Sequence, residues 1–194
     1  MPERIDYLAG IDAAYLKETS VGAVAVLDCS DLSMVEFQVA HFKTRFPYVP
    51  TFLSFREIPP AYSAIRKLHT KPDVFLVDGQ GFAHPYCLGF ASHLGLILEK
   101  PTIGVAKSLL CGKVEQNVEG GRIVTLKDNE VVVGAMVITK AGTKPLYVSV
   151  GHRMSLKRAT EIVLACTGKY RIPEPIRRAH LIANEEKRRL QSSL

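Results

Sequence analysis

The sequence is poor in the residues that mark zinc-binding, disulfide-linked and membrane-spanning proteins. It has no tryptophan, and its four cysteines, Cys29, Cys87, Cys111 and Cys166, include no Cys-x-x-Cys pair. This spacing argues against a zinc site and against a disulfide framework, and it fits a reducing compartment. No apolar run approaches the ~18 residues of a membrane span, and residues 1–6 lack the basic-then-apolar profile of a secretory signal. We therefore expect a soluble, cytoplasmic protein.

Nucleotide-binding signatures are also missing. Gly79-Gln80-Gly81 follows a strand-like run, but it lacks both the third glycine of a dinucleotide fingerprint and the Lys-Ser/Thr of a P-loop. The chain shows no internal repeat and no low-complexity linker. With 194 residues, of which 47% are hydrophobic, it can bury one sizeable core. A single domain over residues 1–194 is the expectation.

Positive charge is in excess. Lysine and arginine total 25 against 19 aspartates and glutamates, which gives a net charge of +6. A basic surface favours a polyanionic partner, although many basic proteins bind none. Part of the charge falls in a helix expected after residues 173–175, at Arg177, Arg178, Lys187, Arg188 and Arg189, interrupted by Glu185 and Glu186. For any one of these side chains a solvated helix face is the simpler explanation.

The chain is organised around a strand and turn at residues 73–81. Residues 74–77 are all apolar, as in a strand that is buried on both faces in the centre of a sheet. Asp78 ends this strand, and Gly79 and Gly81 allow a sharp turn and the close approach of a ligand. Ligands of open α/β sheets bind at such carboxyl ends. The other explanation is that Asp78 only caps the turn.

The first forty residues predict an antiparallel meander. Residues 8–16, 21–27 and 34–42 are rich in strand-forming residues, and the polar links between them are too short for crossovers. Asp12 lies inside the first strand, where a buried carboxylate needs compensation. A metal ion, or a buried hydrogen bond to a lysine or to backbone amides, would each supply it.

A stiff loop follows the meander. Pro47-Tyr48-Val49-Pro50 presents an aromatic ring between two prolines, where it can stack on a base or fold onto the core as an ordinary loop aromatic. Thr51 is a candidate N-cap for the segment that contains Glu57.

The remaining segments predict alternating helices and strands. We expect helices at residues 62–69, 86–98 and 155–168, the last capped by Ser155, strands at 102–106 and 146–150, and a hairpin of 123–126 with 131–138. Lys107 follows one strand end, where it is an exposed lysine or, beside Asp78, a phosphate contact. The predicted fold class is α/β, with a mixed sheet in which an antiparallel meander is followed by parallel strands and flanked by helices.

Carboxylates are expected to converge on this sheet. If the first strand of the meander lies beside the strand that ends at Asp78, Asp12 and Asp78 come together and repel one another. Divalent cations with oxygen ligands remove such repulsion, and Mg²⁺ takes one or two carboxylates together with waters and substrate phosphate. With a nearby lysine and a basic surface, this arrangement is that of a metal-dependent phosphodiesterase.

Several local strings, in order, are similar to those of the endonuclease V (deoxyinosine 3′ endonuclease) family, which has a ribonuclease H-like fold. They are Gly10-Ile-Asp-Ala-Ala-Tyr15, Pro47-Tyr-Val-Pro50 leading into Phe55-Arg-Glu57, Val77-Asp-Gly-Gln-Gly81 with His84-Pro85, Ile103-Gly-Val-Ala-Lys107-Ser108, Val148-Ser-Val-Gly-His152 and Arg171-Ile-Pro-Glu-Pro175. Together they cover nearly the whole chain.

The resemblance implies a set of site residues. Asp12 and Asp78 would ligate the catalytic Mg²⁺, for which Mn²⁺ would substitute, and Glu57 and His152 would complete the active site. Lys107 would steady the scissile phosphate or the leaving group. The wedge that separates strands at the lesion would be Pro47, Tyr48, Val49 and Pro50, and Leu53, Gly79, Gly81 and His84 would line the pocket for extruded hypoxanthine. Thr51 departs from the glycine of some relatives, which alters pocket size or loop freedom.

The implied activity is cleavage 3′ to deoxyinosine by a monomer, which initiates the repair of deaminated adenine. Inosine-containing RNA is a further possible substrate, because discrimination by the 2′-hydroxyl depends on groove geometry. Two alternatives stay open. Another ribonuclease H-like nuclease, specific for junctions or hybrids, would share the acids without the wedge, and a non-catalytic nucleic-acid-binding module would keep only the basic surface.

Overall fold

The computed structural model describes residues 4–115 and 122–192, and within them the chain divides into two compact units. The first unit comprises residues 4–76 and 175–192, and the second comprises residues 77–174 without 116–121. The chain passes from one unit to the other within strand β4 (Val74–Asp78). The expectation of a single domain stays a prediction.

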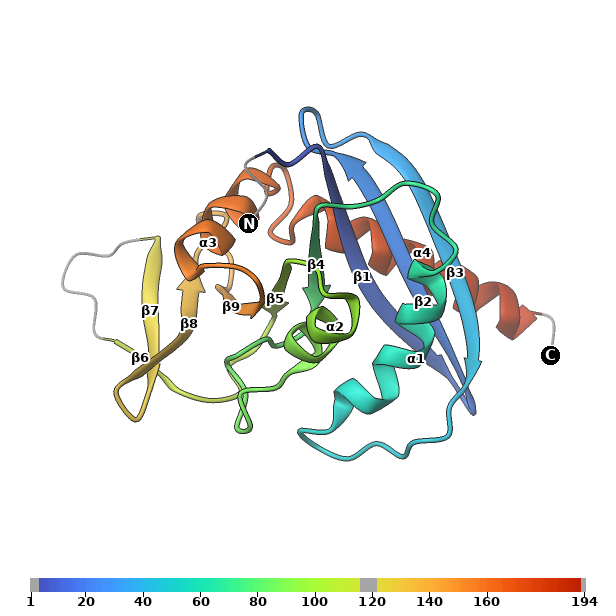
Figure 1. The fold of residues 1–194 in the computed structure, drawn as a ribbon, viewed down its shortest axis with the longest axis horizontal. Coiled ribbons are helices and arrows are strands. Elements are labelled where there is room, and N and C mark those ends of the chain that lie inside the picture. The colour runs from blue at the N-terminus through green and yellow to red at the C-terminus, as the bar shows by residue number, and fades with distance from the viewer. Residues whose placement is uncertain (1–3, 116–121, 193–194) are drawn as a thin grey trace. The chain divides into compact units, whose positions relative to one another are not determined.

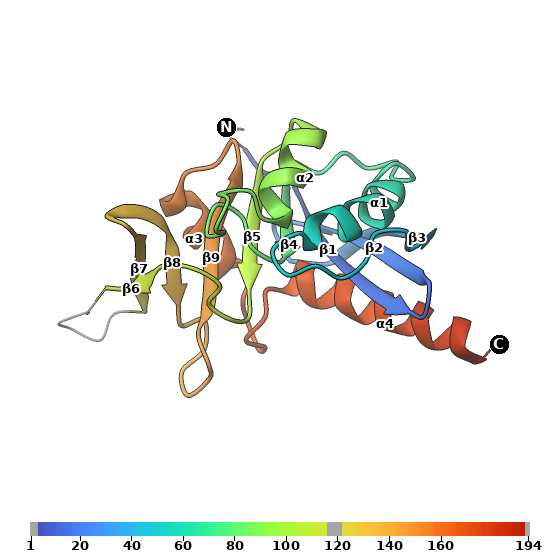
Figure 2. The same cartoon turned by 90° about the horizontal axis from the view of Figure 1, so that it is seen from below.

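The first unit contains β1 (Tyr7–Leu16), β2 (Thr19–Asp28), β3 (Met34–Lys43), α1 (Leu53–Ile65) and the start of β4, with α4 (Glu174–Ser192) from the end of the chain. Its strand order is β3-β2-β1-β4. The three-stranded antiparallel meander is confirmed, and Asp12 of β1 pairs with Ala23 of β2. Figures 1 and 2 show α1 and α4 on opposite faces of this meander.

Two glycines allow the helices of the first unit to pack closely on their strands. A Cβ atom at Gly22 would lie 2.2 Å from the backbone of Pro60 in α1, and one at Gly10 would lie 1.9 Å from the backbone of Pro175 in α4. Along β2, alternate residues therefore face α1 and α4. Asp12 shares the α4 face, because its partner Ala23 packs against Ala183 of that helix.

The starts of β1 and β4 are joined side by side. The amide of Asp73 donates to the carbonyl of Tyr7 at 2.9 Å. In return, Oδ2 of Asp73 accepts hydrogen bonds from the amides of Asp6 and Tyr7, at 2.8 and 3.0 Å. Because the two strands are neighbours and meet at their starts, they run parallel.

The second unit contains the end of β4, α2 (Phe90–Leu98), β5 (Thr102–Ala106), β6 (Lys113–Val114), β7 (Ile123–Asp128), β8 (Val131–Val137), β9 (Leu146–His152) and α3 (Leu156–Ala165). Its strand order is β4-β5-β9-β8-β7-β6, and β9 runs antiparallel to β5. The hairpin of β7 with β8 is confirmed, as is Ser155, which caps α3 by accepting from the amide of Arg158. The mixed sheet with flanking helices is the predicted fold class.

Several helix boundaries differ from the prediction, including the ends of α1 at Ile65 and of α3 at Ala165, which were expected at residues 69 and 168. Helix α1 begins at Leu53 and includes Pro59 and Pro60, whereas a helix was expected only from residue 62. Proline removes backbone hydrogen bonds inside a helix, but burial of Pro60 and its neighbours against β2 compensates that cost. The N-cap is Phe52 and not Thr51, and α2 begins at Phe90 rather than at residue 86. Among the described residues, no helix is both long and apolar enough to cross a membrane.

Candidate active site

Asp12 lies in the middle of β1 and is 9% exposed. Its Oδ2 atom lies 2.7 Å from Nδ1 of His180, which comes from the second turn of α4. A carboxylate only accepts hydrogen bonds, so Nδ1 carries the proton and donates it to Asp12. The compensation expected for a buried carboxylate is thus partly supplied by an imidazole 168 residues away in the sequence.

His180 was not among the residues expected in the site. His180 lies in the second turn of a helix that the sequence predicted correctly, in the string Arg177-Arg-Ala-His180. This position was the one sign in the sequence that could have pointed to it. The side chain of Asn184, one turn further along α4, holds the ring. The side-chain nitrogen of Asn184 lies 3.2 Å from Nε2 of His180. It also donates to the backbone carbonyl of His180 at 2.9 Å. An amide N–H that points at Nε2 fits the tautomer with its proton on Nδ1.

Asp78 and Lys107 form an ion pair in the second unit. Asp78 is the last residue of β4, and Lys107 comes directly after the last residue of β5. Nζ of Lys107 donates to Oδ2 of Asp78, while nearly half of the lysine side chain stays exposed. Both groups lie at the carboxyl ends of their strands, as predicted. Gln80 fixes the segment behind Lys107 by donating to the carbonyl of Ser108 at 3.0 Å.

Glu57 is buried in α1, and its charge acts on Tyr15 at the end of β1. Burial raises the pKa of the Tyr15 hydroxyl strongly, and the carboxylates of Glu57 and Asp12 add to this effect. The guanidinium of Arg56 lies 4.2 Å from the centre of the Tyr15 ring, and its positive charge acts to lower the pKa of the hydroxyl. The first unit therefore brings two of the expected acids, Asp12 and Glu57, within electrostatic range of one phenol.

His152 does not lie with Lys107 at the carboxyl end of β5. It is the last residue of β9 and pairs with Thr102 at the start of β5. Because β9 is antiparallel to β5, its end lies at the opposite edge from Lys107, about 16 Å away for five residues at ~3.3 Å each. The carboxyl end of a strand marks the site edge only when that strand is parallel to its neighbours, and the sequence did not reveal the direction of β9.

The loop before α1 presents Tyr48, whose side chain is 67% exposed between Pro47 and Pro50. Three phenylalanine rings support this loop. The ring of Phe55 stacks on that of Phe46 at 5.6 Å and lies 5.9 Å from that of Phe52. Val49 fixes the end of the loop by accepting a hydrogen bond from the amide of Phe52 at 3.0 Å. Leu53, a predicted pocket residue, opens α1 directly after it.

The loop after β4 is tightly packed. The amide of Gly81 donates to Oγ of Ser149 at 2.8 Å, and a Cβ atom at Gly81 would lie 2.3 Å from the carbonyl oxygen of Val150. Gly79 lies against the ring of Phe90. His84 is buried, and its Nδ1 atom accepts from the amide of Tyr86 at 3.2 Å. The structure thus places Gly79, Gly81 and His84 in one short, rigid segment.

The donor groups suit a hard divalent cation. Asp12 and Asp78 offer carboxylate oxygens and His180 offers an imidazole nitrogen. Carboxylate oxygens are the ligands that Mg²⁺ prefers, and Mn²⁺ also accepts an imidazole. Each of the two carboxylates accepts a hydrogen bond from an N–H donor, so neither lacks a partner.

The chain matches a family model described as Endonuclease V over residues 1–181. It is 49% identical over 187 residues to an endonuclease V of Nostoc punctiforme, covering 95% of this chain and 85% of that protein. The crystal structure of an endonuclease V from Streptomyces avermitilis superposes with a TM-score of 0.90 at 39% identity, covering 95% of this chain and 82% of that one. That of Ciona intestinalis endonuclease V, in complex with a 24mer DNA containing an inosine followed by a ribo-adenosine, gives a TM-score of 0.86 at 33% identity, covering 96% and 88%.

Proposed function

The chain belongs to the endonuclease V family, and we propose on that basis that it is a divalent-metal-dependent endonuclease for deoxyinosine in DNA. It hydrolyses a phosphodiester bond 3′ to the lesion and so initiates the repair of deaminated adenine. The observation that carries this proposal is the similarity over 96% of the chain to a relative crystallised with inosine-containing DNA. The pairing of each key carboxylate with its own N–H donor supports it.

We assign the metal to Asp12 and Asp78, with His180 orienting the carboxylate of Asp12. The register of the two strands supports this assignment. The hydrogen bond from Asp73 to Tyr7 joins the starts of β4 and β1, and each carboxylate follows five residues further along its own strand. Parallel strands advance by the same ~3.3 Å per residue, so equal steps from a common starting point keep two residues in register. When bound, a divalent cation supplies an activated water and stabilises the leaving oxygen.

The protein groups around the acids position the substrate. Asp78 would help to hold the cation, and the ammonium of Lys107, released from that carboxylate, would meet the scissile phosphate or the leaving group. The carboxylate of Glu57, held in α1 within electrostatic range of Tyr15, orients water. His180 replaces His152 in this proposal, because it is the histidine that contacts Asp12.

Base recognition is assigned to the two short loops. Hypoxanthine carries a carbonyl where adenine carries an amino group. A backbone N–H in a pocket lined by Gly79 and Gly81 would donate to the carbonyl and would leave the amino group without a partner. The amides of Gly79 and Gly81 themselves donate to Val77 and Ser149, so these two residues shape the pocket. His84 and Leu53 complete the pocket wall. A mispaired inosine costs less to extrude than a normal base, and Tyr48 fills the space that the base leaves in the stack.

One cleavage assay tests the proposal. An end-labelled DNA duplex with a single inosine is incubated with Mg²⁺, with Mn²⁺ and with a chelator. A single nick on the 3′ side of the inosine, present with either metal and absent with the chelator, is the expected result. Matched substrates are the same duplex with adenine, an inosine-containing RNA, a four-way junction and an RNA–DNA hybrid. Equal cleavage of the adenine duplex, or preference for the junction or hybrid, would assign the chain to another nuclease activity. Binding of all duplexes without cleavage would make it a non-catalytic module.

A further inference from the structure

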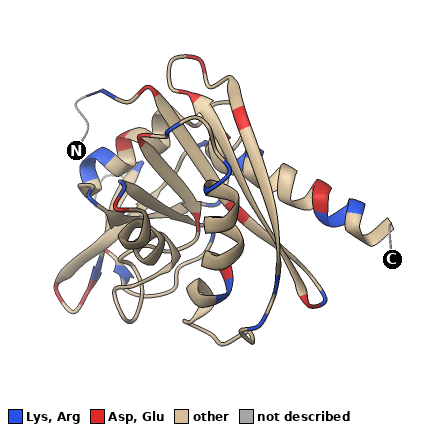
Figure 3. Cartoon of the chain, turned by 45° about the vertical axis from the view of Figure 1, so that its right-hand side comes forward, with Lys and Arg blue, Asp and Glu red and all other residues tan. Residues whose placement is uncertain are grey.

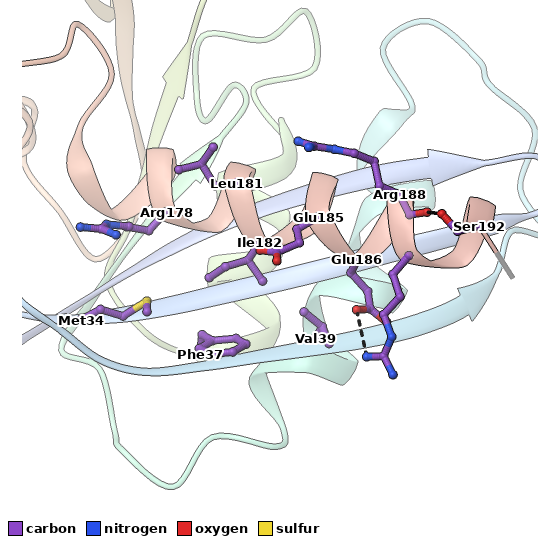
Figure 4. Close-up of a pocket in the computed structure, with 11 residues that line it drawn as sticks. Met34, Phe37, Val39, Arg178, Leu181, Ile182, Glu185, Glu186, Arg188 and Ser192 are labelled. Atoms are coloured by element: carbon purple, nitrogen blue, oxygen red, sulfur yellow. Dashed lines mark hydrogen bonds and ion pairs between the residues drawn. The ribbon is translucent and has the colours of Figure 1, made fainter.

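Helix α4 presents two different exposed sides. Its buried residues include Ile176, Ala179 and Ala183, which recur on one stripe and face the meander. On the side towards β3, a groove is lined by apolar side chains, including Phe37 and Ile182, together with charges of both signs (Figure 4). Figure 3 marks the acidic and basic positions along this helix.

The other side of α4 carries a second groove of about 320 Å³. It is lined by His180, Leu181, Asn184, Lys187, Arg188 and Gln191. Five of these six residues offer N–H groups, and none is acidic. The groove begins at the imidazole that holds Asp12 and continues along the helix away from it.

The two positive charges of this groove are available to an anion. Glu186 is the carboxylate adjacent in sequence, but it is bound by His41 at 2.8 Å and lies 3.7 Å from Arg189 on the side of the helix that faces β3. Within the described ranges, neither Lys187 nor Arg188 makes an ion pair with a carboxylate. Glu185 and Glu186 line the groove towards β3 and do not line this one, whereas Leu181 and Arg188 lie on the border and line both.

We infer that this groove, which we name the α4 groove, binds the sugar–phosphate backbone of the DNA strand that enters or leaves the active site. The inference rests on the proposed function for the choice of DNA. From His180 to Arg188 the helix advances about 12 Å at ~1.5 Å per residue. This equals the rise of three to four nucleotides at ~3.4 Å each. Lysine and arginine contact phosphates as charges, and the amides of Asn184 and Gln191 donate to phosphate oxygens without reading sequence.

The salt dependence of binding tests the inference. Binding of a fluorescein-labelled duplex, with and without one inosine, is measured by anisotropy between 50 and 300 mM salt in Ca²⁺, which takes the same oxygen ligands as Mg²⁺. Each phosphate contact contributes about 0.7 to 0.9 to the slope of log K against log salt. The double variant Lys187→Ala with Arg188→Ala should therefore lower the slope by about 1.4 to 1.8. The loss should be the same for both duplexes.

A matched control removes the same charge from the other side of the helix. Arg178→Ala with Arg189→Ala should leave the slope at the wild-type value, and Lys187→Arg with Arg188→Lys should retain it because charge is kept. An unchanged slope for the groove variant, or an equal fall in the control variant, would overturn the inference. If the wild-type protein shows no preference for inosine while the groove variant still lowers the slope, the proposed function fails and the α4 groove remains a DNA contact.

Discussion

At the scale of single residues, each of the two acids at the site has its own nitrogen donor. His180 donates to Asp12 and Lys107 donates to Asp78, so each carboxylate has a hydrogen-bond partner. The two donors differ in kind. Their side chains are exposed to a similar degree, 50% and 45%, but the imidazole also contacts the side-chain amide of Asn184, whereas the flexible lysine chain can turn to another anion.

Lys107 is predicted to act mainly on the chemical step. A positioned charge near a developing negative charge is worth ~3 kcal/mol, so Lys107→Ala should lower the single-turnover cleavage rate by roughly a hundredfold with a smaller change in affinity. Rapid-quench kinetics with saturating enzyme separate the two effects. A loss of binding with the chemical step unchanged would instead make Lys107 an anchor for the DNA backbone.

Tyr48 is predicted to matter most where a base has to be removed from a stack. Its exposed ring should contribute ~1–3 kcal/mol by stacking. Tyr48→Ala should therefore slow cleavage of fully paired inosine duplexes more than cleavage of single-stranded or bulged substrates. Tyr48→Phe, the matched control, retains the stacking face and most of the activity. Equal losses of Tyr48→Ala on paired and unpaired substrates would show that the ring only supports the loop.

At the scale of elements, the loop before α1 contains a strained residue. Thr51 has a φ angle of +70°, in the left-handed region that β-branched residues avoid at a cost of about 1–2 kcal/mol. Glycine relieves this strain but loses ~0.5–1 kcal/mol through the greater freedom of the unfolded chain. We therefore expect Thr51→Gly to change the free energy of unfolding by less than about 1 kcal/mol.

The comparison with alanine isolates the backbone effect at this position. Alanine keeps the strain of a positive φ angle, so Thr51→Ala should be less stable than Thr51→Gly by about 1 kcal/mol. Urea unfolding of the two variants measures this difference. An alanine variant as stable as the glycine variant would mean that the loop adopts another conformation in solution.

Glu36 connects β3 to the segment after α1. Partial burial raises the pKa of its carboxyl, but hydrogen bonds from the amides of His69 and Thr70 outweigh this and lower it to about 2. A depressed folded-state pKa contributes stability that is present above the unfolded value of 4.5 and is lost as pH falls towards 2. Glu36→Gln should thus be less stable than wild type at pH 6, and the difference should shrink between pH 4.5 and 2. A constant difference in urea-unfolding free energy across that range would contradict this role.

At the scale of the whole molecule, binding of the proposed metal at Asp12 and Asp78 is coupled to folding. A ligand that binds only the folded state stabilises it by about 2.7 kcal/mol at one hundred times its Kd. Mn²⁺ and Mg²⁺ should therefore raise the Tm of the wild-type protein. Asp12→Asn and Asp78→Asn should each abolish this rise and also abolish cleavage, while duplex binding is largely retained.

The thermal shift provides a readout that does not depend on activity. Glu18→Gln changes an acid of the exposed Lys43–Glu18 ion pair and should keep the full metal-dependent rise. A rise that persists in either of the two asparagine variants, or near wild-type nicking by one of them, would show that the assigned carboxylate does not bind the cation.

The sequence by itself determined the elements whose signals are local. The meander, β4, β5 and the β7–β8 hairpin follow from short runs of strand-forming residues bounded by turns, and their bounds are close to those predicted. The family was also identified from local strings alone. Asp78, Lys107 and Tyr48 were proposed as site residues for the same reason, since each stands beside a turn signal or a strand end that is visible in the sequence.

Tertiary structure decided what depends on contacts between distant segments. Helix α1 continues through Pro59 and Pro60 because β2 packs against it, which no local pattern reveals. The antiparallel direction of β9 takes His152 to the far edge of β5, and the packing of α4 on β1 brings His180 to Asp12. Strand direction and helix docking are set by the burial of apolar surface over the whole fold, so only the folded structure showed which histidine contacts Asp12.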